Sequence, residues 1–436
     1  MTILLTDRLD AVAAAAAPER VGTVSAAVGL SVDVTGTGAA VGDLLTVDHG
    51  PELEVVAVQA GTARCMPVST AGHLRVGMRV RPLRSGATIP TGRHLFGRVL
   101  DGLGRPIDGK GPLTAPRYVS PANSSPNAMT RARITAPVQT GVRVLDTLTT
   151  LGRGQRIGLF AGSGVGKSSL LSMIARGTDA EVSVIALIGE RGREVREFLE
   201  DDLGEEGLAR SVVIVATSDE PALMRLRAAF TATRIAESFR DDNADVVLMM
   251  DSLTRVAMAQ REIGLSVGEP PATRGYPPST FSTLARLLER AGTAETGSVT
   301  GIYTVLVDGD DHNEPIADAA RSILDGHVVL DRRLAVAGHF PAIDPLASIS
   351  RVASKVTTAE QRQHATTLRQ HLAAKQGVQD LIDVGAYREG ANRLVDQAIA
   401  HDAQITAFLR QSMDEQAPYD TSWAQIARLT TDLGGA

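Results

Sequence analysis

The sequence predicts an α/β fold: a core built on a parallel sheet, preceded by a small N-terminal β-barrel and followed by a C-terminal helical domain. Three observations predict it. Apolar residues alternate with polar ones from residue 21, short apolar runs alternate with helical stretches beyond residue 150, and the chain becomes polar and helical from about residue 357. We expect an N-terminal helical segment, the barrel, the core and the helical domain at residues 1–20, 21–90, 91–356 and 357–436, respectively.

Composition is that of an ordinary soluble globular protein. The 436 residues are 43% hydrophobic and 22% charged, and 44 basic against 50 acidic residues give a net charge of −6. That balance argues against a general nucleic-acid binder, which carries a basic surplus. The single cysteine, Cys65, fits a reducing compartment, and no apolar run approaches the roughly 18 residues of a membrane span. We expect a cytoplasmic protein and leave contact with a membrane surface open.

The first part of the chain carries two patterns. Residues 6–19 are rich in alanine and form either a short amphipathic helix or a frayed terminus. From Val21, apolar residues fall at every second position, which is typical of strands with one buried face. Gly, Asp and Pro punctuate the gaps, so this region predicts a small β-barrel or sandwich. The alternating positions are Val24, Ala26, Val28, Leu30, Val32 and Val34, and then Leu74, Val76, Met78 and Val80.

A proline-rich connector leads into the α/β region. Five prolines between residues 112 and 137 restrict the backbone and remove hydrogen-bond donors, so we expect little regular structure there. The short runs that follow are apolar on both faces, as in buried parallel strands of a doubly wound sheet. Near the C-terminus, pairs such as Leu368 with Leu372 have helical spacing. The runs are Ile157–Ala161, Val182–Ile188, Val212–Ala216, Val246–Met250 and Ile302–Val307.

The first of these runs leads into a Walker A sequence, which begins at Ala161 where the strict pattern has glycine. The glycines let backbone N–H groups surround phosphate oxygens, and the following helix adds positive potential at its N-terminus. Lys167 would reach the β- and γ-phosphates, and Ser168 would ligate Mg²⁺. The residues expected to bind the nucleotide are Gly162, Ser163, Gly164, Val165, Gly166, Lys167, Ser168 and Ser169.

Two carboxylates follow other apolar runs. Asp251 ends the run that begins at Val246, which is the Walker B form, and we expect it to hold the Mg²⁺ shell. Glu190 follows the run that ends at Ile188, where a carboxylate near a P-loop can orient the attacking water. The alternative for Glu190 is a solvated charge cluster.

Further stretches resemble the rotary ATP synthase superfamily. Gly189-Glu190-Arg191 is similar to its catalytic segment. Residues 341–350 contain the Pro-x-x-Asp core and the closing Ser-x-Ser of its signature, and Arg351 follows where that superfamily places an arginine finger. Within the superfamily, the chain looks most like the flagellum-specific and type III protein-export ATPases, from about residue 21 to the C-terminus. The stretches that carry this likeness are 95–106, 251–262, 268–279 and 309–315.

The resemblance implies a RecA-like P-loop core and roles for four residues. Glu190 would be the general base or water-orienting carboxylate, and Arg191 a phosphate contact. Arg351 would reach the γ-phosphate bound by a neighbouring subunit. Phe340 would lie on the adenine, unless it is simply a core aromatic.

The resemblance also implies cofactors and partners. ATP and Mg²⁺ would bind a homohexameric ring that energises export of unfolded flagellar proteins through a type III secretion apparatus. The partners would be an export regulator or stator protein, chaperone–substrate complexes and the export gate. This would place the protein peripherally, at the cytoplasmic side of the inner membrane.

Rival interpretations share the same catalytic residues. They are a virulence-type III secretion ATPase and a catalytic-type subunit of a rotary ATP synthase. A hexameric nucleic-acid motor is disfavoured, because residues 21–90 contain no Phe, Tyr or Trp on which bases would stack. A non-catalytic paralogue is disfavoured because Lys167, Glu190 and Arg351 are all present.

Overall fold

The computed structural model describes residues 20–69, 72–83, 88–114, 116–307 and 314–434. The expected N-terminal helix and most of the 309–315 stretch therefore lie outside the described residues. The chain divides into two compact units. The first consists of Met1–Ala87, Pro221–Leu223 and Glu262–Pro270, and the second of Thr88–Glu220, Met224–Arg261 and Pro271–Ala436.

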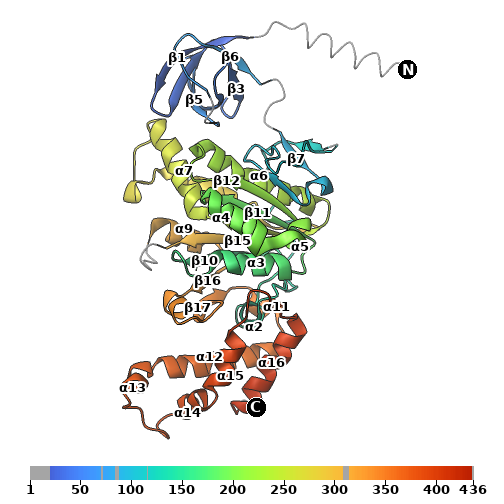
Figure 1. Ribbon diagram of the computed structural model, residues 1–436, viewed down its shortest axis with the longest axis vertical. Coiled ribbons are helices and arrows are strands. Elements are labelled where there is room, and N and C mark those ends of the chain that lie inside the picture. Colours follow the sequence, from blue (N-terminus) through green and yellow to red (C-terminus); the bar gives the residue numbers. More distant parts are fainter. Residues whose placement is uncertain (1–19, 70–71, 84–87, 115, 308–313, 435–436) are drawn as a thin grey trace, which may run out of the picture. The chain divides into compact units, whose positions relative to one another are not determined.

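The first unit contains the expected barrel. Six antiparallel strands of the described residues close in the order β1-β2-β5-β4-β3-β6 (Figure 1). Alternating side chains such as Val24, Val34 and Val55 fill its interior. The strands are β1 (Gly22–Val28), β2 (Ser31–Thr35), β3 (Leu44–Val47), β4 (Glu52–Gln59), β5 (Thr62–Pro67) and β6 (Arg79–Pro82).

One strand prediction in this unit is wrong. The alternation from Leu74 predicted a strand through Val80, but β6 begins only at Arg79. Gly77 interrupts the pattern because its φ of 89° lies in the left-handed region, where it forms a turn rather than extended backbone. Val76 is accordingly exposed.

The second unit is built on a largely parallel sheet, which confirms the predicted fold class. Among the described residues it has nine strands, in the order β17-β16-β10-β15-β13-β11-β12-β8, with β14 paired to β15. Only β14 and β17 run antiparallel to their neighbours. The five predicted runs are all strands. The bounds are β8 (Arg98–Leu100), β10 (Arg156–Ala161), β11 (Val182–Ile188), β12 (Ser211–Ala216), β13 (Asp245–Asp251), β14 (Gly292–Thr293), β15 (Ser298–Leu306), β16 (Gly326–Leu330) and β17 (Ile343–Ser350).

Helices cover both faces of this sheet, so its strands are apolar on both sides. In β11, Val184 and Ala186 pack into one core with residues of α6, whereas Ile185 and Leu187 pack into another with residues of α3. The helices of the region are α2 (Arg143–Leu148), α3 (Lys167–Gly177), α4 (Gly192–Glu197), α5 (Gly204–Ala209), α6 (Ala222–Asp241), α7 (Leu253–Ser266), α8 (Pro278–Leu288), α9 (Pro315–Ile323) and α10 (Arg332–Val336).

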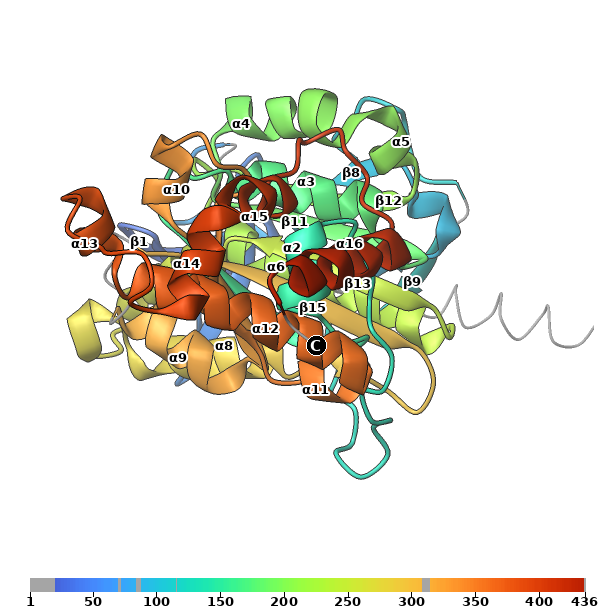
Figure 2. The same cartoon turned by 90° about the horizontal axis from the view of Figure 1, so that it is seen from below.

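The C-terminal part is helical, as predicted, and packs around the short helix α2. Helices α12, α15 and α16 all contact α2 (Figure 2). Thr358 and Gln361 form a capping box that fixes the start of α12. Among the described residues, no helix has the length and apolar character needed to span a membrane. The helices are α11 (Ala353–Val356), α12 (Ala359–Gln376), α13 (Gln379–Asp383), α14 (Arg393–Ala400), α15 (Asp402–Leu409) and α16 (Tyr419–Asp432).

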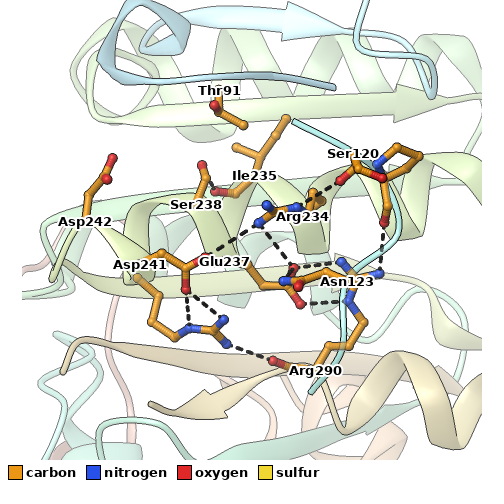
Figure 3. A network of polar contacts seen from close by, with 12 residues as sticks. Thr91, Ser120, Asn123, Arg234, Ile235, Glu237, Ser238, Asp241, Asp242 and Arg290 are labelled. Carbon is orange, nitrogen blue, oxygen red and sulfur yellow. Dashed lines mark hydrogen bonds and ion pairs between the residues drawn. The ribbon is translucent and has the colours of Figure 1, made fainter. Parts of the chain in front are cut away.

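The proline-rich connector is mostly irregular, apart from β9 (Arg117–Val119), which pairs with β7 (Ile89–Thr91). A buried polar network holds it to α6 (Figure 3). Glu237 is fully buried and accepts two hydrogen bonds of 2.7 Å from Arg290. Its Oε2 also accepts one of 2.7 Å from Asn123, and Arg234 Nε donates to Ser120 O at 3.0 Å. Side-chain hydrogen bonds thus hold this segment in place, where most of it has no strand-to-strand backbone hydrogen bonds.

This network predicts a large stability effect. Glu237→Ala leaves the guanidinium of Arg290 buried without its partner, which costs about 3–5 kcal/mol in the free energy of unfolding. Urea unfolding followed by fluorescence or circular dichroism measures this. The matched control is Glu197→Ala, which breaks the exposed ion pair with Arg193 and should change stability little. Equal small losses in both variants would contradict a structural role for the network.

Candidate nucleotide and catalytic site

The Walker A residues form a loop between β10 and α3. Gly164 and Gly166 have φ values of 75° and 91°, so both positions require the left-handed region that glycine adopts freely. Gly166 caps α3, which begins at Lys167. The first N–H groups of that helix have no intrahelical partners and therefore face outward as phosphate donors. Ser168, in the first turn, is exposed.

The lysine of this loop meets both predicted carboxylates. Lys167 Nζ lies 2.6 Å from Asp251 Oδ1 and 3.3 Å from Glu190 Oε1. The three residues come from the carboxyl ends of β10, β13 and β11, which share one edge of the parallel sheet. This is the edge at which ligands bind in such sheets.

Burial and charge shift two of these groups. Burial alone would lower the Lys167 pKa, but the carboxylates of Asp251 and Glu190 raise it, so the ammonium stays charged. Burial and the nearby Asp251 charge raise the pKa of Glu190, and Lys167 opposes this only in part. A raised pKa makes Glu190 a stronger proton acceptor than an exposed glutamate.

Asp251 and Ser168 fit the predicted magnesium site. Asp251 is buried and its Oδ1 accepts from Lys167 and, at 2.7 Å, from Thr304 Oγ1. A carboxylate at the end of β13 is the kind of ligand that would bind the cation or one of its waters. Among the described residues, no three His, Cys, Asp or Glu side chains gather as a metal cage. Mg²⁺ bound with a nucleotide needs only one or two protein ligands beside phosphates and water.

Two residues near this site were not predicted. Thr304 lies on β15, between β10 and β13, and is fully buried. Arg255 lies beside Gly189: a Cβ at Gly189 would come within 2.8 Å of the Arg255 side chain. The Arg255 Nε is buried and lacks a hydrogen-bond partner, so its N–H can donate to an anionic ligand. The only sequence signals were a polar residue inside an apolar run and an arginine four positions after Asp251.

Phe340 lies next to the P-loop. A Cβ at Gly166 would lie 3.5 Å from its ring, and the side chain is 46% exposed. The ring therefore is not a core aromatic in this chain, and its open face can cover a base.

Arg351 lies at the other end of the sheet. Strand β17 runs antiparallel to β16, pairing Ile343 with Leu330 near the P-loop edge and Ser350 with Gly326 at the opposite edge. Arg351 N donates to Asp325 O, whose own N–H donates to Arg156 O at the start of β10. The P-loop follows the end of that strand, roughly 20 Å away at about 3.3 Å per residue. Arg351 therefore cannot reach the nucleotide site of its own chain.

Arg191 makes none of the contacts of the P-loop lysine. Its side chain is 76% exposed and pairs with Glu194 at 3.3 Å. The structure thus brings together Lys167, Asp251 and Glu190, places Phe340 beside the loop, and leaves Arg191 and Arg351 outside that cluster.

Sequence comparisons with known proteins cover most of this chain. Residues 141–350 match the nucleotide-binding domain of the ATP synthase alpha/beta family, and residues 357–428 match the T3SS EscN ATPase C-terminal domain. The flagellum-specific ATP synthase of Bacillus subtilis (strain 168) is 51% identical over 421 residues, covering 94% of this chain and 95% of that protein. The SPI-2 type 3 secretion system ATPase of Salmonella typhimurium (strain LT2) is 51% identical over 379 residues, covering 87% of each.

A solved structure has the same architecture. The assembled ATPase EscN of the enteropathogenic E. coli type III secretion system superimposes with a TM-score of 0.89 at 42% identity, covering 94% of this chain and all of that one. EscN in complex with its central stalk EscO gives a TM-score of 0.87.

Proposed function

The chain is a P-loop ATPase that belongs to the ATP synthase alpha/beta family, among its flagellum-specific and type III secretion members, and we propose that it energises export of unfolded flagellar proteins. The observation that carries the catalytic part is the convergence of Lys167, Asp251 and Glu190 at one edge of the sheet. The flagellar assignment is supported by identity at equal coverage: the flagellum-specific ATP synthase of Bacillus subtilis is 51% identical over 94% of this chain, and the type 3 secretion system ATPase of Xanthomonas euvesicatoria is 47% identical over 95%.

Hydrolysis needs little covalent work from the protein. The loop N–H groups and Lys167 bind the β- and γ-phosphates, and Glu190 aligns water for in-line attack and accepts its proton. Mg²⁺, held by Ser168 and Asp251, would neutralise charge between the two phosphates. Thr304 fixes the Asp251 carboxylate, and Phe340 covers the base.

The placement of Arg351 favours a ring. Because its side chain lies at the edge opposite its own P-loop, it can complete a site only on another copy. An interface that joins two different edges of one chain is heterologous, and it forms a ring when the rotation between neighbours closes. We therefore infer a homohexamer in which Arg351 supplies charge to the neighbour's γ-phosphate.

Partners and location follow as proposals from the relatives. EscO is named the central stalk of EscN. We propose that the regulator of this chain binds it as EscO binds EscN. Chaperone–substrate complexes and the export gate would contact the C-terminal helices, with the ring held peripherally at the cytoplasmic face of the inner membrane.

A catalytically dead allele tests this function. Replacing the gene by a Lys167→Ala copy removes the phosphate-binding ammonium, so we expect swimming to stop and extracellular filament protein to fall to background while it accumulates inside cells. Intact motility with loss of other secreted proteins would instead identify a virulence-type ATPase. Normal secretion of both classes with impaired ATP synthesis would identify a rotary synthase subunit.

A further inference from the structure

Gln411 is a buried polar side chain that joins three segments of the second unit. It follows α15 and is 5% exposed. Its Oε1 accepts from Arg143 N at 2.9 Å, and its Nε2 donates to Gly141 O at 2.7 Å and Glu415 O at 2.8 Å. The amide is thus satisfied as both donor and acceptor, which fixes the backbone around it.

The backbone of the same residue holds Phe340. Gln411 N donates to Phe340 O at 3.0 Å. The preceding His339 is buried, and the Leu409 backbone hydrogen-bonds with it. The segment that carries Phe340 therefore rests on the residues that follow α15 in the C-terminal helical domain.

The Phe340 ring needs such support. It is 46% exposed, and none of the described aromatic rings stacks on it. Its position beside Gly166 is consequently set by its backbone, not by a surrounding core. Stacking depends on how the ring is placed over its partner, so a displaced backbone weakens it.

We propose that Gln411 is a positioning residue for the nucleotide base: it holds Phe340 over the base site, so the C-terminal domain sets affinity for the base. This rests on the proposed function, in which Phe340 covers the base. The phosphate-binding loop follows β10, and Glu190 and Asp251 stand at the ends of β11 and β13; none of the three hydrogen bonds of this amide goes to them. Gln411 therefore acts on base affinity and leaves phosphate affinity and the chemical step unchanged.

The test is Gln411→Met, which keeps the side-chain volume and removes the three amide hydrogen bonds. We expect KM for ATP to rise about five- to tenfold with kcat within about twofold of wild type, because only nucleotide binding is weakened. Inhibition by inorganic triphosphate, which lacks a base, should be unchanged. Equal weakening of ATP and triphosphate would overturn the proposal in favour of a general structural role.

The matched control is Thr430→Val, which removes the hydrogen bonds of a buried hydroxyl in the C-terminal domain, with Ile426 O and with His364 Nδ1, far along the chain from Phe340. It should leave KM unchanged. If Gln411→Met does not fold, the second variant is Gln411→Asn, which keeps an amide on a side chain one methylene shorter and should raise KM by a smaller factor; an unchanged KM in that variant counts against the proposal.

A double-mutant cycle with Phe340→Ala separates this inference from the proposed base site. We expect Phe340→Ala to raise KM, and Gln411→Met to add little in that background, because both act through one ring. If Phe340→Ala leaves KM unchanged, the base platform itself is wrong. If Phe340→Ala raises KM but Gln411→Met does not, only the positioning role fails.

Discussion

Glu190→Gln is expected to reduce kcat for ATP by about 10²–10⁴-fold, because the amide cannot accept a proton from the attacking water. KM should change little, since the phosphate contacts of Lys167 and the loop remain. Phosphate release at saturating ATP measures the loss. The matched control is Glu197→Gln on α4, an exposed residue paired with Arg193, which should keep wild-type turnover.

The same substitution should leave stability intact. Burial and the Asp251 charge raise the Glu190 pKa in the folded chain. Near neutral pH the ionised Glu190 carboxylate therefore lowers the free energy of unfolding. Replacing it by an amide removes that cost, while Lys167 keeps its 2.6 Å contact with Asp251. A melting temperature several degrees below wild type would mean that Glu190 is a structural partner of Lys167 and not a base.

The raised pKa also predicts the acid side of the pH profile. Only the ionised carboxylate accepts a proton, so kcat/KM should fall as pH drops through the Glu190 pKa of the free enzyme. Because that pKa lies above the ordinary glutamate value, the fall should begin at a higher pH than an exposed glutamate would give. A flat profile down to the ordinary range would contradict a buried base.

Much of the site could be predicted because its residues follow strand ends. Apolar runs on both faces identify buried parallel strands, and parallel strands bring their carboxyl ends to one edge. Lys167 and Glu190 follow such runs and Asp251 ends one, so the pattern predicted that they lie at one edge. The catalytic role of Glu190 came from the family resemblance, because a solvated charge cluster remained the alternative.

The remaining features depend on non-local pairing. Phe340 and Arg351 lie just before and just after β17, and both were predicted to contact a nucleotide. Because β17 runs across the whole sheet, the two residues lie at opposite edges of it. The direction of β17 is set by its pairing with β16, which no local pattern reveals. Thr304 matters only because β15 lies beside β13. The turn at Gly77 delays the start of β6 to Arg79, although the alternation from Leu74 looked continuous.

Arg351→Ala should be at least as damaging as Glu190→Gln, with a reduction in kcat of about 10³–10⁵-fold, because such arginines stabilise transition-state charge. Since the Arg351 side chain lies far from its own P-loop, the substitution should impair catalysis at the nucleotide site of a neighbouring chain. Turnover per chain of the wild type should therefore rise with protein concentration as rings form. Arg393→Ala, which removes an exposed arginine on α14, should keep normal turnover.

Mixing the two dead variants distinguishes a shared site from a self-sufficient one. In a ring of Glu190→Gln and Arg351→Ala chains at equal amounts, about one interface in four combines an intact Glu190 with a neighbour's intact Arg351. Up to that fraction of wild-type turnover should return on mixing, and less if sites must act in concert. No recovery, together with a constant rate per chain on dilution, would mean that each chain hydrolyses ATP alone. Arg351 would then complete no catalytic site on a neighbouring chain, and catalysis would not require a ring.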